Sequence, residues 1–116
     1  PIRYALNYPE RLPSACRKMS VADYANLTFE APDREKFPLL DMAFDAIHCG
    51  GNVPCALNAA NEIAVAAFLA DRIGFMQMPE VVAEAVARNR FIASPTYDDY
   101  VATNAEIRKI AEELIK

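Results

Sequence analysis

The apolar residues of segment 57–70, LNAANEIAVAAFLA, are arranged as in a helix that other helices surround. The segment is rich in good helix formers and contains neither Gly nor Pro. Its apolar side chains fall on three lines at helical spacing rather than on one stripe. A helix that is apolar nearly all round is buried on most sides, and its many alanines would let neighbouring helices approach closely. The pattern therefore predicts the central helix of a small bundle.

Three amphipathic segments are predicted to pack around this helix. The first runs from Pro38 to about His48 and ends at Gly50-Gly51, the second begins at Pro79, and the third follows Thr103. In the last, Thr103 and Glu106 have the spacing of a capping box, and Arg108–Glu112 and Lys109–Glu113 have the spacing of ion pairs. The predicted inner positions are Leu40, Phe44 and Ile47, then Met78, Val82, Ala85 and Val86, and finally Ile107, Ile110, Ala111 and Leu114.

Residues 1–33 have a different pattern and contain four of the eight prolines. Pro1 suits the start of a short helix, which Pro9 ends. Leu27–Glu30 alternates apolar and polar residues, as a short strand does. Because no second good strand is found to pair with it, we expect it to join a sheet elsewhere. The predicted fold is mainly α: an extended arm with a short strand (1–35), followed by a four-helix bundle-like C-terminal domain (36–116).

Composition narrows the possible partners. The net charge of −4 and the lack of a Lys/Arg cluster predict no nucleic-acid partner. No membrane-spanning segment is expected, because Glu62 and Asp71 interrupt the best apolar run. The three cysteines have no CxxC spacing, which favours reduced thiols in a cytoplasmic protein, although Cys49 and Cys55 are close enough in sequence to pair under oxidation. The chain opens on Pro1 without Met, and we expect a piece of a longer protein.

The polar residues of the central segment, Asn58, Asn61 and Glu62, are the first candidates for chemistry. A carboxylate flanked by carboxamides could act as a general base or metal ligand. A structural role is favoured, with Asn58 capping open N–H groups and Glu62 near the positive end of the helix dipole. The only histidine, His48, suits a helix C-terminus better than a metal site. We therefore predict no catalytic, cofactor-binding or metal residue in this chain.

Residues 57–69, LNAANEIAVAAFL, resemble the signature of the C-terminal part of the 1-deoxy-D-xylulose 5-phosphate reductoisomerase family. Residues 1–6 and 8–11 are similar to the family's segment that follows its active-site loop. Residues 27–30, with Pro32-Asp33 and Phe37-Pro38, resemble the linker strand and the start of the C-terminal domain. Near the last helix, residues 104–108 match the family pattern Asp-x-x-Ala-Arg in part.

This resemblance implies a three-part parent enzyme: an NADPH-binding Rossmann domain, a catalytic domain and a C-terminal helical bundle. The family rearranges and reduces 1-deoxy-D-xylulose 5-phosphate to 2-C-methyl-D-erythritol 4-phosphate for non-mevalonate isoprenoid biosynthesis. It uses NADPH and a divalent metal, Mg or Mn. The family's metal carboxylates, phosphate-binding serines and nucleotide-binding glycines all precede the point that matches Pro1. The resemblance therefore places none of them here.

The expected role is structural. The bundle would brace the catalytic domain of the parent chain and help hold a homodimer in the cytoplasm, and this chain alone would be inactive. A stand-alone helical protein-interaction module is the alternative interpretation.

Overall fold

The computed structural model describes residues 2–24 and 26–115. The chain divides into two compact units, one within residues 1–31 and the other within residues 32–116. The α-helices among the described residues are α1 (Ile2–Asn7), α2 (Pro38–Cys49), α3 (Val53–Leu69), α4 (Gln77–Ala87) and α5 (Tyr97–Leu114), and the 3-10 helix η1 spans Val21–Tyr24. The mainly α fold is therefore confirmed. Among the described residues, no helix has the length and apolar character needed to cross a membrane.

The first unit has little packing of its own. Neither α1 nor η1 contains a buried residue. Local contacts hold α1, where the rings of Tyr4 and Tyr8 meet edge to face at 5.7 Å and the Arg11 guanidinium lies 4.3 Å above the Tyr4 ring. Such contacts order a turn of helix but bury no core.

The strand predicted at Leu27–Glu30 is not formed, and no β-strand occurs among residues 2–24 and 26–115. The segment lacks regular structure, and the Phe29 side chain is 89% exposed. A strand is defined by hydrogen bonds to a neighbour, and the described part of the chain supplies no neighbour.

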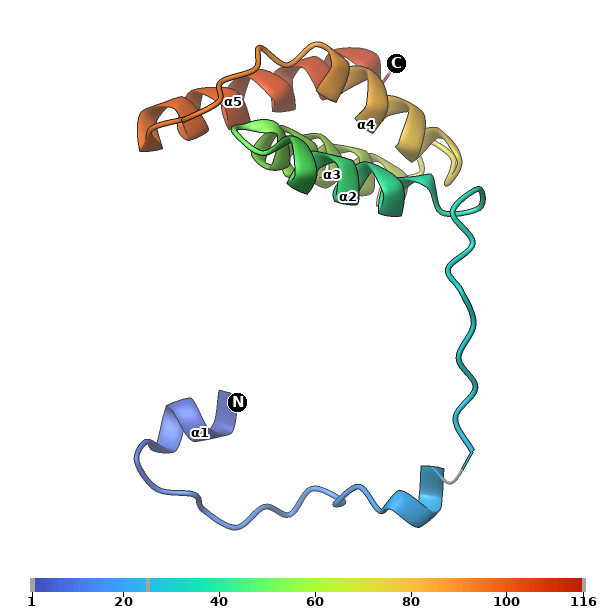
Figure 1. Cartoon of the computed structure of the whole chain (residues 1–116), viewed down its shortest axis with the longest axis vertical. Coiled ribbons are helices and arrows are strands. Elements are labelled where there is room, and N and C mark those ends of the chain that lie inside the picture. The colour runs from blue at the N-terminus through green and yellow to red at the C-terminus, as the bar shows by residue number, and fades with distance from the viewer. Residues whose placement is uncertain (1, 25, 116) are drawn as a thin grey trace. The chain divides into compact units, whose positions relative to one another are not determined.

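The second unit is a bundle of four helices, as predicted, with α3 at its centre. In Figure 1, α2 and α3 form one layer and α4 and α5 lie across the other side of α3. The most extensive packing is that of α3 against α5 and α4, whereas α2 packs mainly against α3. The buried residues of α3 are Ala56, Ala59, Ala60, Ile63, Ala64 and Ala67. Its outer row is open, however, since Val65 and Leu69 are exposed. The prediction of burial therefore holds for the sides that face α2, α4 and α5, and not for the outer side.

The inner faces of α4 and α5 follow the sequence pattern. Met78, Val82 and Ala85 are buried in α4, together with Val81, and Val86 is partly buried. In α5, Ile107 and Ala111 are buried, and Ile110 and Leu114 pack against the core. The predicted inner face of α2 is wrong: Phe44 and Ile47 are exposed, while Ala46 is buried and Leu39 and Met42 pack on the core. Because α2 carries apolar residues on more than one face, spacing alone could not select the buried one.

The last helix begins earlier than predicted. Thr96 is the N-cap of α5: its hydroxyl accepts from the Asp99 backbone N–H, and the Asp99 carboxylate accepts from the Thr96 backbone N–H. The capping box is therefore formed by Thr96 and Asp99, and the prediction that Thr103 and Glu106 form it is wrong. Thr103 instead lies inside the helix and is buried.

The buried side chain of Asn52 links two loops of the bundle. The Asn52 side chain is fully buried, and its Nδ2 faces the Arg90 carbonyl at 2.9 Å and Thr103 Oγ1 at 3.0 Å. Its Oδ1 accepts from the Ile92 backbone N–H at 2.9 Å, and its own backbone N–H donates to the Ile92 carbonyl at 3.1 Å. The Oδ1 of Asn89 also lies 3.2 Å from the Nδ2 of Asn52. One side chain therefore fastens the α2–α3 turn to the α4–α5 connection and to α5.

The turn before Asn52 fits only glycine. Gly51 has a φ of 56°, and a Cβ there would collide with the Ile92 carbonyl and the Phe91 ring. Gly50, with a φ of 70°, ends α2 as the sequence predicted. The left-handed pair lets the backbone turn sharply and reach the α4–α5 connection.

We predict that Asn52→Ala lowers the free energy of unfolding by about 3 kcal/mol, because several buried polar groups lose their partner at once. Urea denaturation of the 116-residue chain measures the change. Asn58→Ala is the matched control on the exposed side of α3, and its effect should stay within about 0.5 kcal/mol. Equal effects of the two substitutions would contradict the role of Asn52.

A second prediction concerns the alanines of α3. Ala64 is fully buried whereas Ala66 is exposed on the same helix. Ala64→Leu should destabilise the bundle by about 1–3 kcal/mol, because the added atoms force the helices apart. Ala66→Leu makes the same change at a solvent-exposed position and should alter the free energy of unfolding by less than about 0.5 kcal/mol. Thermal or urea unfolding of the two variants compares them. If the bundle tolerated Ala64→Leu as well as Ala66→Leu, α3 would not require small residues.

Candidate functional site

The candidate residues of α3 form part of an ion-pair network. Arg108 of α5 donates from Nη1 to Glu62 Oε2 at 2.5 Å, and Asn58 donates from Nδ2 to Glu62 Oε1 at 3.0 Å. Both oxygens of the Glu62 carboxylate are thus engaged. The network joins α3 to α5 near the middle of both helices.

This arrangement favours the structural role of Glu62. Hydrogen bonds from Arg108 and then Asn58, with the Arg108 charge, hold the pKa of Glu62 below its ordinary value. An efficient general base needs a pKa near the working pH and a free oxygen. Glu62 has neither, because its pKa is lowered and both of its carboxylate oxygens accept hydrogen bonds. Glu62 also does not lie at the start of the helix, because α3 begins at Val53. Asn58 therefore bonds a side chain and does not cap the helix.

The predicted ion pairs of α5 are rearranged. Arg108 pairs with Glu62 rather than with Glu112, and Glu112 accepts from Arg72 at 3.2 Å. Arg72 also donates to the carbonyl of Ile115. The Lys109–Glu113 pair lies at 4.0 Å as the spacing suggested. Contacts of α5 with α3 and with the α3–α4 connection thus replace one of the two predicted pairs. The spacing of residues within one helix cannot predict such contacts.

Asn61 lines a groove between α2 and α3. The groove encloses about 340 Å³. Its lining residues are Leu39, Ala43, Ala46, Ile47, Pro54, Leu57, Asn58 and Asn61. None of these lining residues is charged, so the groove offers no cation to hold the phosphates of NADPH or of a sugar phosphate. Its chemistry suits an apolar surface with a few hydrogen-bonding groups.

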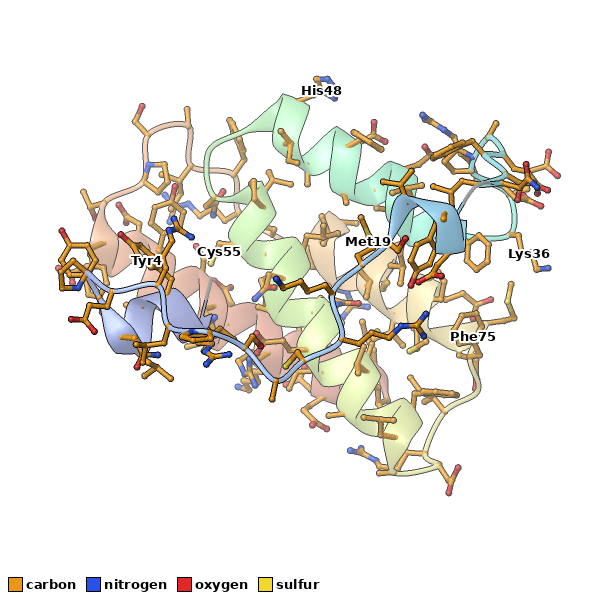
Figure 2. All side chains as sticks on the ribbon, turned by 90° about the horizontal axis from the view of Figure 1, so that it is seen from below. Tyr4, Met19, Lys36, His48, Cys55 and Phe75 are labelled. Carbon is orange, nitrogen blue, oxygen red and sulfur yellow. The ribbon has the colours of Figure 1, made fainter. Side chains whose placement is uncertain are left out.

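The other candidates stay apart from this groove. His48 lies near the end of α2 and points away from the bundle (Figure 2). The described cysteines are free: Cys16 and Cys49 are exposed, while Cys55 is half-buried, and burial raises the pKa of its thiol. Within residues 2–24 and 26–115, no three His, Cys, Asp or Glu side chains gather as metal ligands. These residues therefore do not fit a resident divalent metal.

Sequence reasoning missed the groove and the role of Arg108. The only sequence signal for the groove is the surplus of apolar residues on α2, which exceeds what one buried face needs. Arg108 could not be found in this way, because its partner Glu62 lies 46 positions away.

Comparison with known proteins places this geometry in a family. The family model described as the DXP reductoisomerase C-terminal domain matches residues 1–110. A 1-deoxy-D-xylulose 5-phosphate reductoisomerase of Bacteroides thetaiotaomicron is 50% identical over 115 residues, which are 99% of this chain and 30% of the relative. The enzyme of Acetivibrio thermocellus is 42% identical over 116 residues, again 30% of its length.

Solved structures agree with the sequence relatives. The 1-deoxy-D-xylulose 5-phosphate reductoisomerase from Zymomonas mobilis in complex with NADPH has a TM-score of 0.81 and 36% identity, over 97% of this chain and 30% of that one. A DOX-P reductoisomerase with fosmidomycin and magnesium has a TM-score of 0.78 and 32% identity, over 98% and 31%. The chain thus spans about 30% of the length of its relatives. It belongs to the DXP reductoisomerase C-terminal domain family.

Proposed function

We propose that this chain is the C-terminal structural part of a reductoisomerase that converts 1-deoxy-D-xylulose 5-phosphate to 2-C-methyl-D-erythritol 4-phosphate. The observation that carries the proposal is the 50% identity to a named reductoisomerase across nearly the whole chain. The resemblance of residues 57–69 adds that the reaction feeds non-mevalonate isoprenoid biosynthesis. The parent enzyme would work in the cytoplasm.

The parent would use NADPH and a divalent metal, Mg or Mn. Related structures are complexes with NADPH and with magnesium. Both ligands would bind the longer part of the parent chain. The uncharged α2–α3 groove lacks the cations for phosphate, and the carboxylate Glu62 is committed to Arg108.

The two units of the chain suggest different roles in the parent. Residues 1–35 would be the end of the catalytic domain and the linker arm, and residues 36–116 would be the bundle. The arm has no buried residue in α1 or η1, which suits a segment that packs on another part of the enzyme. The bundle has its own core and would brace the catalytic domain and help hold a homodimer.

A stand-alone helical interaction module is the second interpretation. The self-contained core of α2–α5 supports it. The unpaired Leu27–Glu30 segment and the exposed Leu6, Tyr8 and Phe29 side chains favour the reductoisomerase, because a complete module would bury its apolar arm.

The test is an activity assay on the full reading frame that contains these 116 residues. The full-length protein should oxidise NADPH when supplied with 1-deoxy-D-xylulose 5-phosphate and Mg²⁺, and a chelator should abolish the reaction. The 116-residue chain should show no turnover above background under the same conditions.

Circular dichroism of the 116-residue chain provides the control, because a helical spectrum shows that inactivity is not misfolding. An inactive but folded full-length protein would contradict the proposed reaction. Turnover by the 116-residue chain alone would contradict the structural role of this part.

A further inference from the structure

The five residues before α2 form a hydrogen-bonded turn. We name residues 33–37 the entry turn. The Asp33 carboxylate accepts from the Lys36 backbone N–H at 2.9 Å, and the Asp33 carbonyl accepts from the Phe37 backbone N–H at 3.0 Å. The Phe37 carbonyl then accepts from the backbone N–H of Leu40 in α2, again at 3.0 Å. The entry turn therefore leads into α2 without a break in hydrogen bonding.

Arg34 attaches the entry turn to the side of α2. Its Nη1 donates to Asp41 Oδ1 at 2.6 Å, and its guanidinium lies 5.6 Å from the centre of the Phe44 ring. One exposed ion pair contributes little stability by itself. Here the ion pair and the cation–π contact hold the same side chain at two positions of α2 that are one turn apart. Arg34 thus gives the exposed ring of Phe44 a partner.

The end of the entry turn also borders α4 and the connection before it. A small apolar cavity of about 90 Å³ is lined by residues from both segments. Its lining residues are Lys36, Phe37, Pro38, Leu39, Phe75, Met76, Met78 and Pro79. Lys36 and Phe75 accordingly lie on the same side of the bundle (Figure 2). The entry turn is therefore placed against more than one element of the bundle.

The segment before the entry turn has a different character. Residues 26–32 have no regular structure, and all of them are exposed. The boundary between the two compact units falls between Ala31 and Pro32. The ring of Pro32 fixes its own φ and keeps Ala31 out of the α region. The change from free to anchored backbone therefore occurs at a short, conformationally restricted step.

We propose that the entry turn is a rigid extension of the bundle and that Ala31-Pro32 is the joint that sets the direction of the bundle in the parent enzyme. Leu27–Glu30 is expected to join a sheet of the parent, which leaves only these two residues between that sheet and the entry turn. Asp33 and Arg34 are then positioning residues, and the bundle begins at residue 33 rather than at residue 36. The proposal rests on the proposed function, because that function supplies the preceding part of the enzyme.

Backbone NMR relaxation of the 116-residue chain tests the rigidity of the entry turn. Amides of residues 34–37 should have order parameters of about 0.85, as in the helices of the bundle, and amides of residues 26–31 should fall below about 0.6. Order parameters below about 0.6 at residues 34–37 would overturn the proposal, because the turn would then move independently of α2. Equally high values at residues 26–31 would also overturn it, because no joint would remain.

Hydrogen exchange tests the role of Asp33 in the same chain. Asp33→Ala removes the acceptor of the Lys36 amide, and the protection of that amide should fall about fivefold. Asp33→Asn keeps an oxygen at this position and should retain most of the protection. Glu35→Ala is the matched control, since it makes the same acid-to-alanine change at an exposed position of the same turn. An equal loss of protection in Asp33→Ala and Glu35→Ala, or no loss in either, would contradict the role of Asp33.

The joint is tested in the full-length enzyme by inserting Gly-Ser between Ala31 and Pro32. The kcat for NADPH oxidation should fall at least about tenfold, because the longer joint no longer fixes the direction of the bundle. The KM for NADPH should stay within about twofold, since this ligand would bind the longer part of the chain. The same insertion between Ala93 and Ser94, in the exposed α4–α5 connection, is the matched control. It should leave kcat within about twofold, because exposed loops tolerate added length.

The outcomes separate this proposal from the proposed function. Equal kcat values for the two insertions would overturn the positioning role of the joint. So would a lower urea midpoint of the 116-residue chain that carries the joint insertion, because the insertion would then act on the folding of the bundle. A folded full-length protein that does not oxidise NADPH rejects the proposed function. The relaxation and exchange data on the 116-residue chain do not depend on that activity and still decide whether the entry turn belongs to the bundle.

Discussion

The close approach of helices at the alanines of α3 is the constraint on which the bundle depends. α4 and α5 pack against α3, whose buried residues include Ala60 and Ala64, and these short side chains add almost no bulk to the core. Dense packing of this kind gains dispersion energy over many atom pairs, and it lets a chain this short bury an apolar core. Asn52 then fixes the end of the bundle, because its carboxamide satisfies backbone groups that the packing of loops would otherwise leave unpaired.

The same packing leaves one side of α3 free for contact with other molecules or domains. A helix packed by alanines on three sides has one free side, and that side carries apolar residues and two carboxamides rather than a catalytic set. Glu62, the one carboxylate that the sequence singled out, is held by Arg108 and stabilises the α3–α5 contact. The family assignment agrees with this division, because the relatives are enzymes of which this chain covers about 30%. A rigid bundle with an open face is suited to supporting a larger catalytic part.

Sequence patterns predicted the helices that have one buried face and an opposite polar face. The stripes of α4 and α5 and the central position of α3 follow from spacing, because polar residues mark the opposite faces. The face of α2 could not be predicted, because Phe44 and Ile47 are as apolar as the residues that are buried. Thr96 and Thr103 both have an acidic residue three positions later. Thr96 caps α5, so Thr103 lies inside the helix, where its hydroxyl contacts the Asn52 side chain. The Arg108–Glu62 pair joins positions far apart in the sequence, so no local sequence pattern could predict it.

Hydrogen exchange on the 116-residue chain tests the central claim most directly. If the bundle is self-sufficient and the arm needs another part of the enzyme, the slowest amides should lie in the middle of α3, around Ala60 and Ala64. Amides of residues 2–24 should exchange near the rate of an unstructured chain, because nothing in α1 or η1 is buried. Protection of these arm amides as strong as that of α3 in the monomeric chain would contradict the account and favour a complete, stand-alone module.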